Sequence, residues 1–138
     1  IMKPDNKARW TIGVYALVVN DKKQVLLIKR KDNGLWQSPG GGVSYKESPL
    51  KAVVRETQEE SGFIVEVEKF LGAYFSIERN DMILTFQCDV VGGKPIISDE
   101  TTDVRFFSLN TLPKMTPATI MRIRDYLAHD YCGFVAEI

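Results

Sequence analysis

Residues 38 to 63 read SPGGGVSYKESPLKAVVRETQEESGF, and this stretch decides the fold. It begins with a run of three glycines, Gly40 to Gly42. Glycine loses more conformational entropy on folding than other residues, so such a run marks a place where the backbone adopts a positive φ or comes unusually close to another group. A plain strand-to-helix turn explains one glycine but not three.

The residues after the glycines predict a single helix. Ser48 is a good N-cap, Pro49 suits the first helical position and Gly62 is a typical stop signal, so the helix should cover residues 49 to 61. At about 100° per residue it has two different faces. The apolar face comprises Leu50, Val53, Val54 and Thr57, and the acidic face comprises Glu56, Glu59 and Glu60.

The acidic face of this helix has two interpretations. Most charge runs are solvated surfaces. However, like charges one turn apart repel by roughly 0.2 to 0.5 kcal/mol per pair, and the last helical turn, which holds Glu59 and Glu60, carries the negative end of the helix dipole. Arg55, one turn before Glu59, offsets part of this repulsion. A bound divalent cation would make the arrangement favourable, because Mg²⁺ is commonly held by a few carboxylates together with water and phosphate oxygens.

The spacing of these residues resembles the signature of the Nudix hydrolases, the MutT-like family. That signature is G-x5-E-x7-R-E-U-x-E-E-x-G-U, where U is a bulky apolar residue. Here Gly41 is followed at the required spacing by Glu47 and then by RETQEESGF, residues 55 to 63. The likeness extends more loosely to LWQSPGGGV before this box and to DVRFFSLNTLP after it, so it covers most of the chain.

Two positions depart from the family pattern. Thr57 stands where an aliphatic residue is usual, and Ser38 replaces the apolar residue that usually precedes the Pro-Gly-Gly run. We expect Thr57 to pack with its methyl group while its hydroxyl bonds back to the carbonyl of Val53. Neither departure touches a residue that the resemblance places at the metal.

The resemblance implies a fold and a metal site. The fold is α/β, an α/β/α sandwich with a mixed sheet and a loop, helix, loop segment, and residues 1 to 138 would form a single domain. The cofactor would be Mg²⁺, with Mn²⁺ as an alternative. Its ligands would be Glu56, Glu59 and Glu60, with a carbonyl of Gly40 or Gly41 as a further ligand. In this interpretation the glycines let the backbone approach the metal and a polyphosphate.

The resemblance also implies a reaction, the hydrolysis of a phosphoanhydride in a nucleoside diphosphate linked to another moiety. Water would attack phosphorus, with Glu59, Glu60 and Arg55 in catalytic positions and Arg55 orienting a carboxylate through a salt bridge. Glu47 would support the loop or a further metal. The substrate-binding positions would be Arg30, Gly40, Gly41 and Glu47, although most strand-end arginines are plain surface charge.

The general base of that reaction could come from the helix or from a later loop. In SDETTDV, residues 98 to 104, Glu100 is the first candidate and Asp103 the second, and a solvated turn explains either residue equally well. Trp36 could stack on a base, but packing in or near the core explains it better. His129, near the end of a helix, needs only its interaction with the helix dipole.

A binding module that senses a nucleotide such as ADP-ribose without turnover is the alternative function on the same fold. The complete set of box carboxylates favours the enzyme. A P-loop is a poor rival, because the lysine and the following Ser or Thr of GxxxxGK[ST] are missing, as is the GxGxxG of dinucleotide-binding folds.

Composition narrows the partners. The 138 residues are 44% hydrophobic and 26% charged, which is typical of one globular domain. Eighteen basic residues balance eighteen acidic ones, so no global positive field draws the protein to a nucleic-acid polymer or to anionic lipid. Cys88 and Cys132 lack CxxC spacing, and no targeting or membrane segment is visible. We expect a cytoplasmic protein with a small nucleotide substrate; the oligomeric state is not indicated.

Other parts of the chain predict strands and a final helix. The apolar runs at residues 10 to 19 and 24 to 30, separated by NDKK, predict a β-hairpin. The alternation of MILTFQCDV, residues 82 to 90, places Cys88 in the core, and strands are also expected within residues 64 to 77 and 104 to 109. The final helix should begin after an N-cap at Thr116 with Pro117 and present Ile120, Ile123 and Leu127 on one face.

Overall fold

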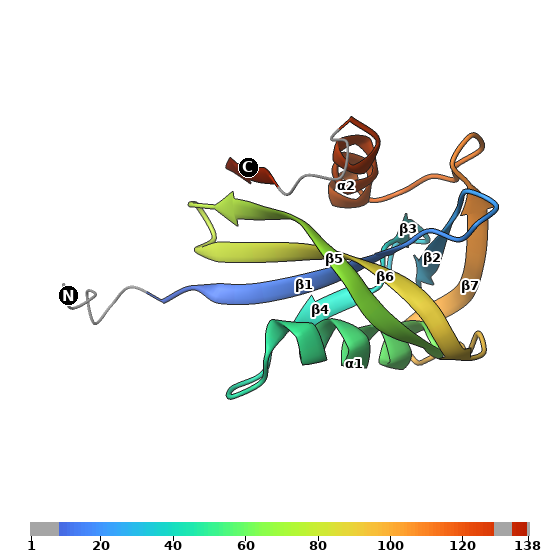
Figure 1. Ribbon diagram of the computed structural model, residues 1–138, viewed down its shortest axis with the longest axis horizontal. Helices are drawn as coiled ribbons and strands as arrows, with labels where there is room; N and C mark the ends of the chain where they lie inside the picture. Colours follow the sequence, from blue (N-terminus) through green and yellow to red (C-terminus); the bar gives the residue numbers. More distant parts are fainter. Residues whose placement is uncertain (1–8, 129–133, 138) are drawn as a thin grey trace.

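Two β-sheets and two helices make up the computed structural model, which describes residues 9 to 128 and 134 to 137 (Figure 1). The larger sheet has the strand order β4-β1-β6-β5-β8. Its strands are β1 (Thr11–Val18), β4 (Gly40–Gly42), β5 (Phe63–Ser76), β6 (Asp81–Gly93) and β8 (Phe134–Glu137). This sheet is mixed, because β1 runs parallel to β6 and β5 parallel to β8, whereas the other pairs are antiparallel.

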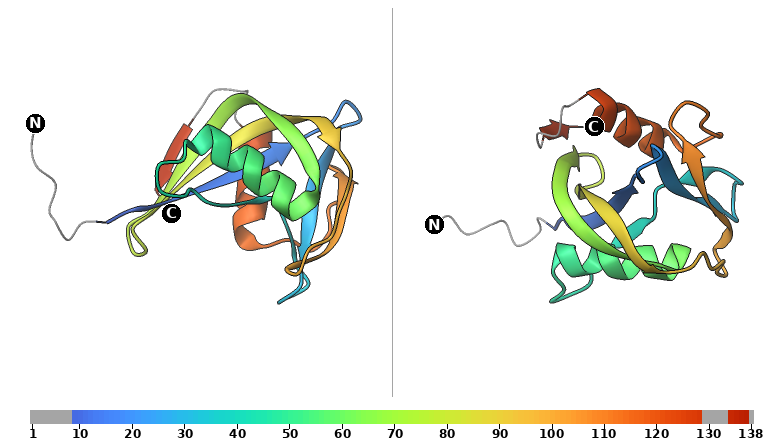
Figure 2. Two further views of the ribbon diagram at one scale, coloured as in Figure 1. Left: turned by 90° about the horizontal axis from the view of Figure 1, so that it is seen from below. Right: turned by 45° about the vertical axis from the view of Figure 1, so that its right-hand side comes forward.

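The smaller sheet is antiparallel, with the order β3-β2-β7. Its strands are β2 (Gln24–Arg30), β3 (Trp36–Gln37) and β7 (Thr101–Ser108). The helices α1 (Pro49–Ser61) and α2 (Pro117–Ala128) lie on opposite sides of the larger sheet (Figures 1 and 2). The expected α/β sandwich with a mixed sheet and a helix after the glycine run is confirmed.

The predicted hairpin of β1 and β2 is wrong. Residues 20 to 23 do turn the chain, and the Asn20 N–H donates to the Gln24 carbonyl at 3.0 Å. After one bridge between Val19 and Val25, however, the two strands diverge into different sheets. The reason is that β4 and β6 occupy both edges of β1, so no edge is left for β2.

Local capping fixes both ends of α1 and the start of α2 as predicted. The Ser48 side chain accepts a hydrogen bond from a first-turn N–H of α1 at 3.1 Å. Gly62 ends α1 in the left-handed conformation, with φ at 82°. The second helix begins at Pro117, directly after Thr116. Such caps need only neighbouring residues, which is why the sequence locates them well.

The buried face of α1 differs from the predicted one at its first turn. Val53 and Thr57 are fully buried with Ala52 and Ser61, whereas Leu50 is 52% exposed, so its assignment to the buried face is wrong. The stripe runs from Val53 through Thr57 to Ser61, and Leu50 lies before it begins. The Thr57 hydroxyl donates to the Val53 carbonyl at 2.7 Å, as expected. This local bond lets a polar residue occupy the core.

The buried side of α2 is more polar than its sequence suggests. Of the three residues on its predicted apolar face, Ile123 is buried, while Ile120 and Leu127 are 38% and 60% exposed. Thr119 and Arg122 are buried beside Ile123 instead. A cationic side chain therefore lies between α2 and the sheet.

Several single-residue expectations concern the core. Cys88 is fully buried, as predicted, and Trp36 packs edge-on against Phe107 with ring centroids 4.6 Å apart. The expectations for His129 and Cys132 concern positions outside the described residues. Within the described ranges, no helix has the length and apolar character needed to cross a membrane.

Candidate active site

Arg55 binds three of the carboxylates that the sequence singled out. Its Nε and Nη2 donate to the two carboxylate oxygens of Glu47 at 2.7 and 2.9 Å. Its Nη1 donates to Glu56 at 2.9 Å and to Glu59 at 3.2 Å. Nη2 also reaches the Gly42 carbonyl at 3.1 Å. Arg55 thus ties the glycine loop and the acidic face of α1 together.

The pairing of Arg55 with Glu47 changes the ionisation of both groups. The guanidinium, together with the Ser44 N–H, lowers the pKa of Glu47 to about 2. Conversely, the bonds to Glu47 and then to Glu56 and Glu59 raise the pKa of Arg55. Both groups stay charged at neutral pH, so this two-bond pair is a permanent support of the loop.

Glu60 lies at the opposite edge of the acidic face and has a different environment. Its Oε1 accepts a hydrogen bond from the Gly40 N–H at 2.7 Å. Burial raises the pKa of Glu60 to about 7, and the neighbouring carboxylates of Glu56 and Glu100 act in the same direction, against the Gly40 N–H and Arg30. A carboxyl group with this pKa can take up or release a proton near neutral pH.

Two of the three glycines are required by close approach. A Cβ at Gly40 would lie 2.5 Å from the ring of Tyr15, and a Cβ at Gly41 would lie 2.5 Å from the Glu56 carboxylate. Gly42 has no such neighbour, and none of the three has a positive φ. The close approach expected from the sequence is thus present at Gly40 and Gly41, while no contact explains the third glycine.

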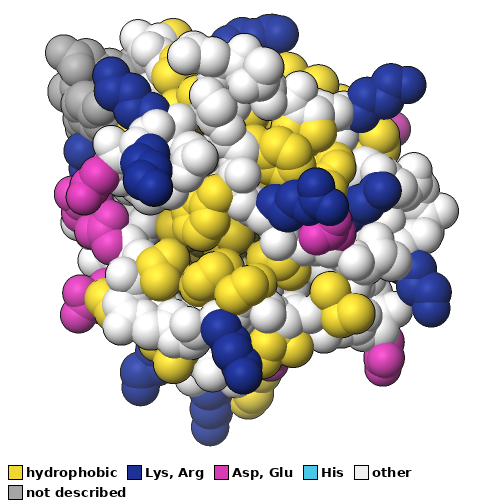
Figure 3. Space-filling view, turned by 90° about the vertical axis from the view of Figure 1, so that its right-hand side faces the viewer, with side chains coloured by type: hydrophobic (Ala, Val, Ile, Leu, Met, Phe, Trp, Pro, Cys, Tyr) yellow, Lys and Arg dark blue, Asp and Glu magenta, His cyan; other side chains and the backbone are white. Residues whose placement is uncertain are grey.

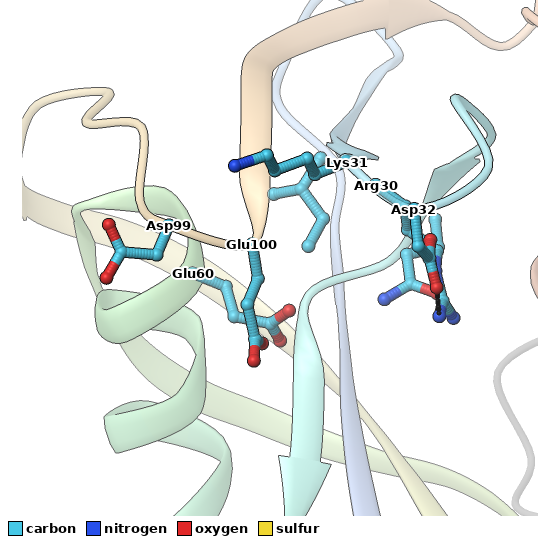
Figure 4. A pocket seen from close by; sticks show the side chains of 8 residues that line it. Arg30, Lys31, Asp32, Glu60, Asp99 and Glu100 are labelled. Atoms are coloured by element: carbon cyan, nitrogen blue, oxygen red, sulfur yellow. Dashed lines mark hydrogen bonds and ion pairs between the residues drawn. The ribbon is translucent and has the colours of Figure 1, made fainter.

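Two adjoining cavities lie beside the acidic cluster. The larger has a volume of about 650 Å³ and is lined by Ile28, Arg30, Lys31, Asp32, Gln37, Glu60, Asp99 and Glu100 (Figure 4). The smaller, of about 410 Å³, is lined by Gly40, Gly41, Glu56, Glu59, Glu60, Ser98, Asp99 and Glu100. Glu60, Asp99 and Glu100 belong to both, so the acidic residues form the boundary between the two spaces.

The larger cavity is also lined by two cations, Arg30 and Lys31, and by the carboxylate of Asp32. Arg30 donates from Nε and Nη2 to the two oxygens of Asp32 at 2.8 and 2.5 Å, and from Nη1 to Gln37 at 3.3 Å. This pairing raises the pKa of Arg30 and lowers that of Asp32. Figure 4 shows the Arg30 and Asp32 pair across from Glu60.

The loop that carries Glu100 is fastened at both ends. The Ile96 N–H donates to the Ser61 carbonyl at the end of α1 (2.9 Å), and the Lys31 N–H donates to the Glu100 carbonyl at 3.0 Å. Glu100 is thereby held between the two sheets, with its side chain beside Glu60 (Figure 4).

A third cavity, of about 400 Å³, lies elsewhere on the molecule. It is lined by Val18, Val19, Asn20, Asp21, Asp89, Val90 and Phe106, none of which lines the other two cavities. Figure 3 views the end of the molecule that carries the β1–β2 turn, where hydrophobic side chains gather in the middle of the face. Because no cation lines this third cavity, it is not suited to a phosphate.

The sequence-derived site residues gather in one region. Arg30, Glu100 and the proposed ligands of α1 and the glycine loop line the two adjoining cavities, while Glu47 and Arg55 support them. Asp103, the second candidate for a base, instead pairs with Arg105 at 2.7 Å and lines neither cavity.

Four lining residues with a charged or amide side chain were missed by sequence reasoning. Three of them, Lys31, Asp32 and Asp99, flank Arg30 or Glu100 in the chain, so adjacency was an available signal. No such signal indicated Gln37, because only the pairing of β2 with β3 brings it beside Arg30.

A family model described as NUDIX domain matches residues 9 to 128. The chain belongs to the Nudix family. An ADP-ribose pyrophosphatase of Methanocaldococcus jannaschii is 38% identical to it over 123 residues, which cover 84% of this chain and 72% of that protein. A MutT-like protein of Streptomyces ambofaciens is 34% identical over 118 residues, 85% of this chain and 77% of that protein.

Solved structures share the Nudix fold. An ADP-ribose pyrophosphatase of Streptococcus suis superposes with a TM-score of 0.76 at 22% identity, covering 93% of this chain and 98% of that one. A Nudix hydrolase of Nitrosomonas europaea gives 0.81 at 21% identity, covering 93% and 78%. The family match and the named relatives show that this chain is a Nudix pyrophosphohydrolase.

The donor set of the Nudix helix fits a hard divalent cation. Glu56, Glu59 and Glu60 offer carboxylate oxygens and Gly41 a carbonyl oxygen, which are the donors that Mg²⁺ and Mn²⁺ prefer. Among the described residues, no three His, Cys, Asp or Glu side chains are arranged to hold an ion as they stand. In this arrangement Glu56 and Glu59 bond to Arg55, while Glu60 accepts from a backbone N–H.

Proposed function

We propose that this Nudix enzyme hydrolyses ADP-ribose, or a closely similar nucleoside diphosphate linked to a sugar phosphate, to two phosphate monoesters. The observation that carries this proposal is the larger cavity, which is lined by Arg30, Lys31 and Asp32 as well as by the acidic residues Glu60 and Glu100. Its volume of about 650 Å³ suits a ligand of nucleotide size. The name of the Methanocaldococcus jannaschii relative supports the same substrate class.

The proposed substrate contacts follow from these lining residues. Arg30 presents a planar guanidinium whose orientation is already fixed by Asp32 and Gln37, so little side-chain entropy is lost when it binds a phosphate oxygen. Lys31 adds a second positive charge. Because Gly40 and Gly41 have no side chains, the smaller cavity beside α1 has space for the diphosphate. Glu47 contributes indirectly, by fixing Arg55 and the loop.

Nudix hydrolases generally use divalent metals, and we propose Mg²⁺ here, with Mn²⁺ as a substitute. The residues that would hold it are Glu56, Glu59 and Glu60, with the Gly41 carbonyl. When bound, such a cation supplies positive charge that neutralises the diphosphate. Arg55 keeps two of these carboxylates close to the cavity in the absence of the ion.

In the proposed reaction, water attacks one phosphorus of the diphosphate. The new P–O bond forms as the bridging P–O bond breaks, the leaving phosphate monoester departs, and a carboxylate takes the proton of the water. Glu100 is our proposed general base, because it lines both cavities and is held in place by the Lys31 N–H. Glu60, a carboxylate of the helix that also lines both cavities, is the second candidate.

A substrate panel with Mg²⁺ tests this proposal. ADP-ribose, a nucleotide sugar, a nucleoside triphosphate and a dinucleoside polyphosphate are each incubated with the protein, and the released monoesters and pyrophosphate are separated. We expect AMP and ribose 5-phosphate from ADP-ribose, and a loss of turnover of at least about 100-fold in Glu100→Gln. Cleavage of the triphosphate alone, to pyrophosphate and a monophosphate, would contradict the substrate class. Tight binding of ADP-ribose without any cleavage would instead support the sensing module.

We also propose that the protein acts in the cytoplasm on small molecules and not on a nucleic-acid polymer. The balance of 18 basic and 18 acidic residues supports the part of this proposal that concerns nucleic acid.

A further inference from the structure

Arg122 of α2 occupies an unusual position for a charged residue. Its side chain is 3% exposed, and its guanidinium lies 3.9 Å from the centroid of the Tyr15 ring in β1. Nη2 donates to the Thr119 hydroxyl at 3.2 Å, while Nε has no hydrogen-bond partner. In the part of the chain that the structure describes, no carboxylate lies within ion-pair distance of this guanidinium. Burying an unpaired cation is costly, so the position needs an explanation beyond packing.

The ring under Arg122 connects it to the active site. Tyr15 is paired with Gly40 across β1 and β4, and it lies so close that a Cβ on Gly40 would come within 2.5 Å of the ring. The Gly40 N–H in turn donates to Glu60 at 2.7 Å. A continuous series of contacts therefore runs from Arg122 through Tyr15 and Gly40 to Glu60.

A second contact joins α2 to the same segment. The Thr119 hydroxyl, which lies 2.9 Å from that of Thr116, accepts a hydrogen bond from the Ser38 N–H at 3.2 Å. Ser38 is fully buried and lies two residues before Gly40. It is also the position at which the sequence departs from the usual apolar residue. Thr119 and Arg122 thus hold the start of the glycine run and the ring beside it.

We propose that Arg122 and Tyr15 are positioning residues, through which α2 fixes the Gly40 N–H that orients Glu60. The proposal rests on the proposed role of Glu60 at the active site. The cation–π contact is well suited to this task, because both partners are planar and the pair allows little lateral freedom. In this way α2, which lies on the opposite side of the sheet from α1, determines how accurately Glu60 is oriented.

Paired variants separate positioning from simple core packing. Arg122→Leu removes the cation and Tyr15→Leu removes the ring, while Ile123→Ala removes a neighbouring buried contact of the same helix that does not reach Gly40. The measurements are kcat and KM with Mg²⁺, and hydrogen exchange of the Gly40 amide in the metal-free protein. For both leucine variants we expect kcat to fall by about tenfold to 100-fold, KM to change by less than about twofold, and the Gly40 amide to exchange faster.

We expect neither the control variant nor the rescue variant to lose kcat or the protection of the Gly40 amide. Ile123→Ala should lower the melting temperature but keep kcat and the Gly40 exchange rate, and Tyr15→Phe, which keeps the ring, should restore both values relative to Tyr15→Leu. If Arg122→Leu fails to fold, Tyr15→Leu tests the same contact from the sheet. Equal losses of kcat in Ile123→Ala and Tyr15→Leu, or an unchanged Gly40 exchange rate in the leucine variants, would overturn the proposal.

The exchange measurement does not depend on turnover. A wild-type protein without activity on any substrate would defeat the proposed function, while the Gly40 amide would still report whether α2 holds the loop.

Discussion

Glu60 combines a partly buried carboxyl group with a hydrogen bond from the Gly40 N–H. Its pKa is raised to about 7 from an ordinary value of 4.5, with burial as the largest cause. In this respect it is the opposite of Glu47, whose pKa falls to about 2 beside Arg55. In the metal-free protein Glu47 is therefore a fixed charge, while Glu60 takes up or releases a proton near neutral pH.

The raised pKa of Glu60 predicts how the stability of the metal-free protein depends on pH. Between pH 4.5 and about 7 the folded state holds a proton that the unfolded state has released, so the free energy of unfolding should fall as the pH rises and then level off above 7. Urea unfolding in the presence of a chelator measures this trend.

The variant Glu60→Gln isolates the contribution of this residue. Its amide oxygen can still accept from the Gly40 N–H, but it does not titrate. As the pH rises from 4.5 to 7, the free energy of unfolding should therefore fall more in the wild type than in the variant. A difference that stays constant over this range would show that Glu60 has an ordinary pKa.

The α1 helix carries more negative charge than its surroundings compensate. Arg55 is its only partner for Glu56 and Glu59 among the described ion pairs, and the last turn contains no basic residue. The Glu59 side chain is 58% exposed, so its ion pair with Arg55 contributes little to stability. We therefore expect a bound cation to stabilise this end of the helix.

Thermal melts of Glu59→Gln test this interpretation. Without metal the variant should melt at the wild-type temperature or slightly higher, because a repulsive charge is removed. Millimolar Mg²⁺ against a Kd near a tenth of a millimolar should stabilise the wild type by roughly 1 to 2 kcal/mol, a shift of a few degrees that the variant lacks.

Glu66→Gln is the matched control, because Glu66 is exposed on β5 and lines none of the cavities. It should keep the full shift with Mg²⁺. A shift of equal size in Glu59→Gln, together with a clear loss of its metal-free stability, would mean that Glu59 is structural and that the ion binds elsewhere.

Elements defined by neighbouring residues could be predicted from the sequence, and those defined by distant pairing could not. The caps at Ser48 and Gly62 gave α1 its correct bounds, since each acts within one turn. The pairing of β1 with β6 is a contact between segments about seventy residues apart, which no local pattern encodes. The buried side of α2 was missed for the same reason. The burial of Arg122 depends on its contact with the ring of Tyr15, which lies far away in the sequence.

The same division applies to the candidate site. The residues of the box lie on one loop and one helix, so their spacing alone brought together the group around Arg55. The opposite wall comes from a different sheet, and Gln37 joins Arg30 there only through tertiary structure.

Across the whole molecule, the larger cavity lies between the two sheets. Arg30 lines it from the end of β2 in the smaller sheet, while Glu60 lies on the helix that covers the larger one. The loop carrying Glu100 connects them, bonded to Ser61 on one side and to Lys31 on the other. The substrate is therefore expected to touch both layers of the fold.

The variant Arg30→Gln tests the proposed contact of Arg30 with the substrate. Loss of charged hydrogen bonds to a phosphate should cost about 1.5 to 3 kcal/mol, which lowers kcat/KM by roughly tenfold to 100-fold. Arg105→Gln is the control, because Arg105 is also paired with an aspartate but lines neither cavity of the site. Equal kcat/KM values for the two variants would remove Arg30 from the substrate contacts.

Because the cavity is built from two separate sheets, one of its walls can change in evolution without the other. Residues such as Lys31 and Gln37, at the ends of small-sheet strands, can be exchanged without disturbing the caps or ion pairs of α1. A few substitutions on that wall would change which molecule is accepted, while the hydrolytic machinery is inherited intact. We therefore expect the substrate range in such a lineage to change by gradual replacement along one wall while the reaction is kept.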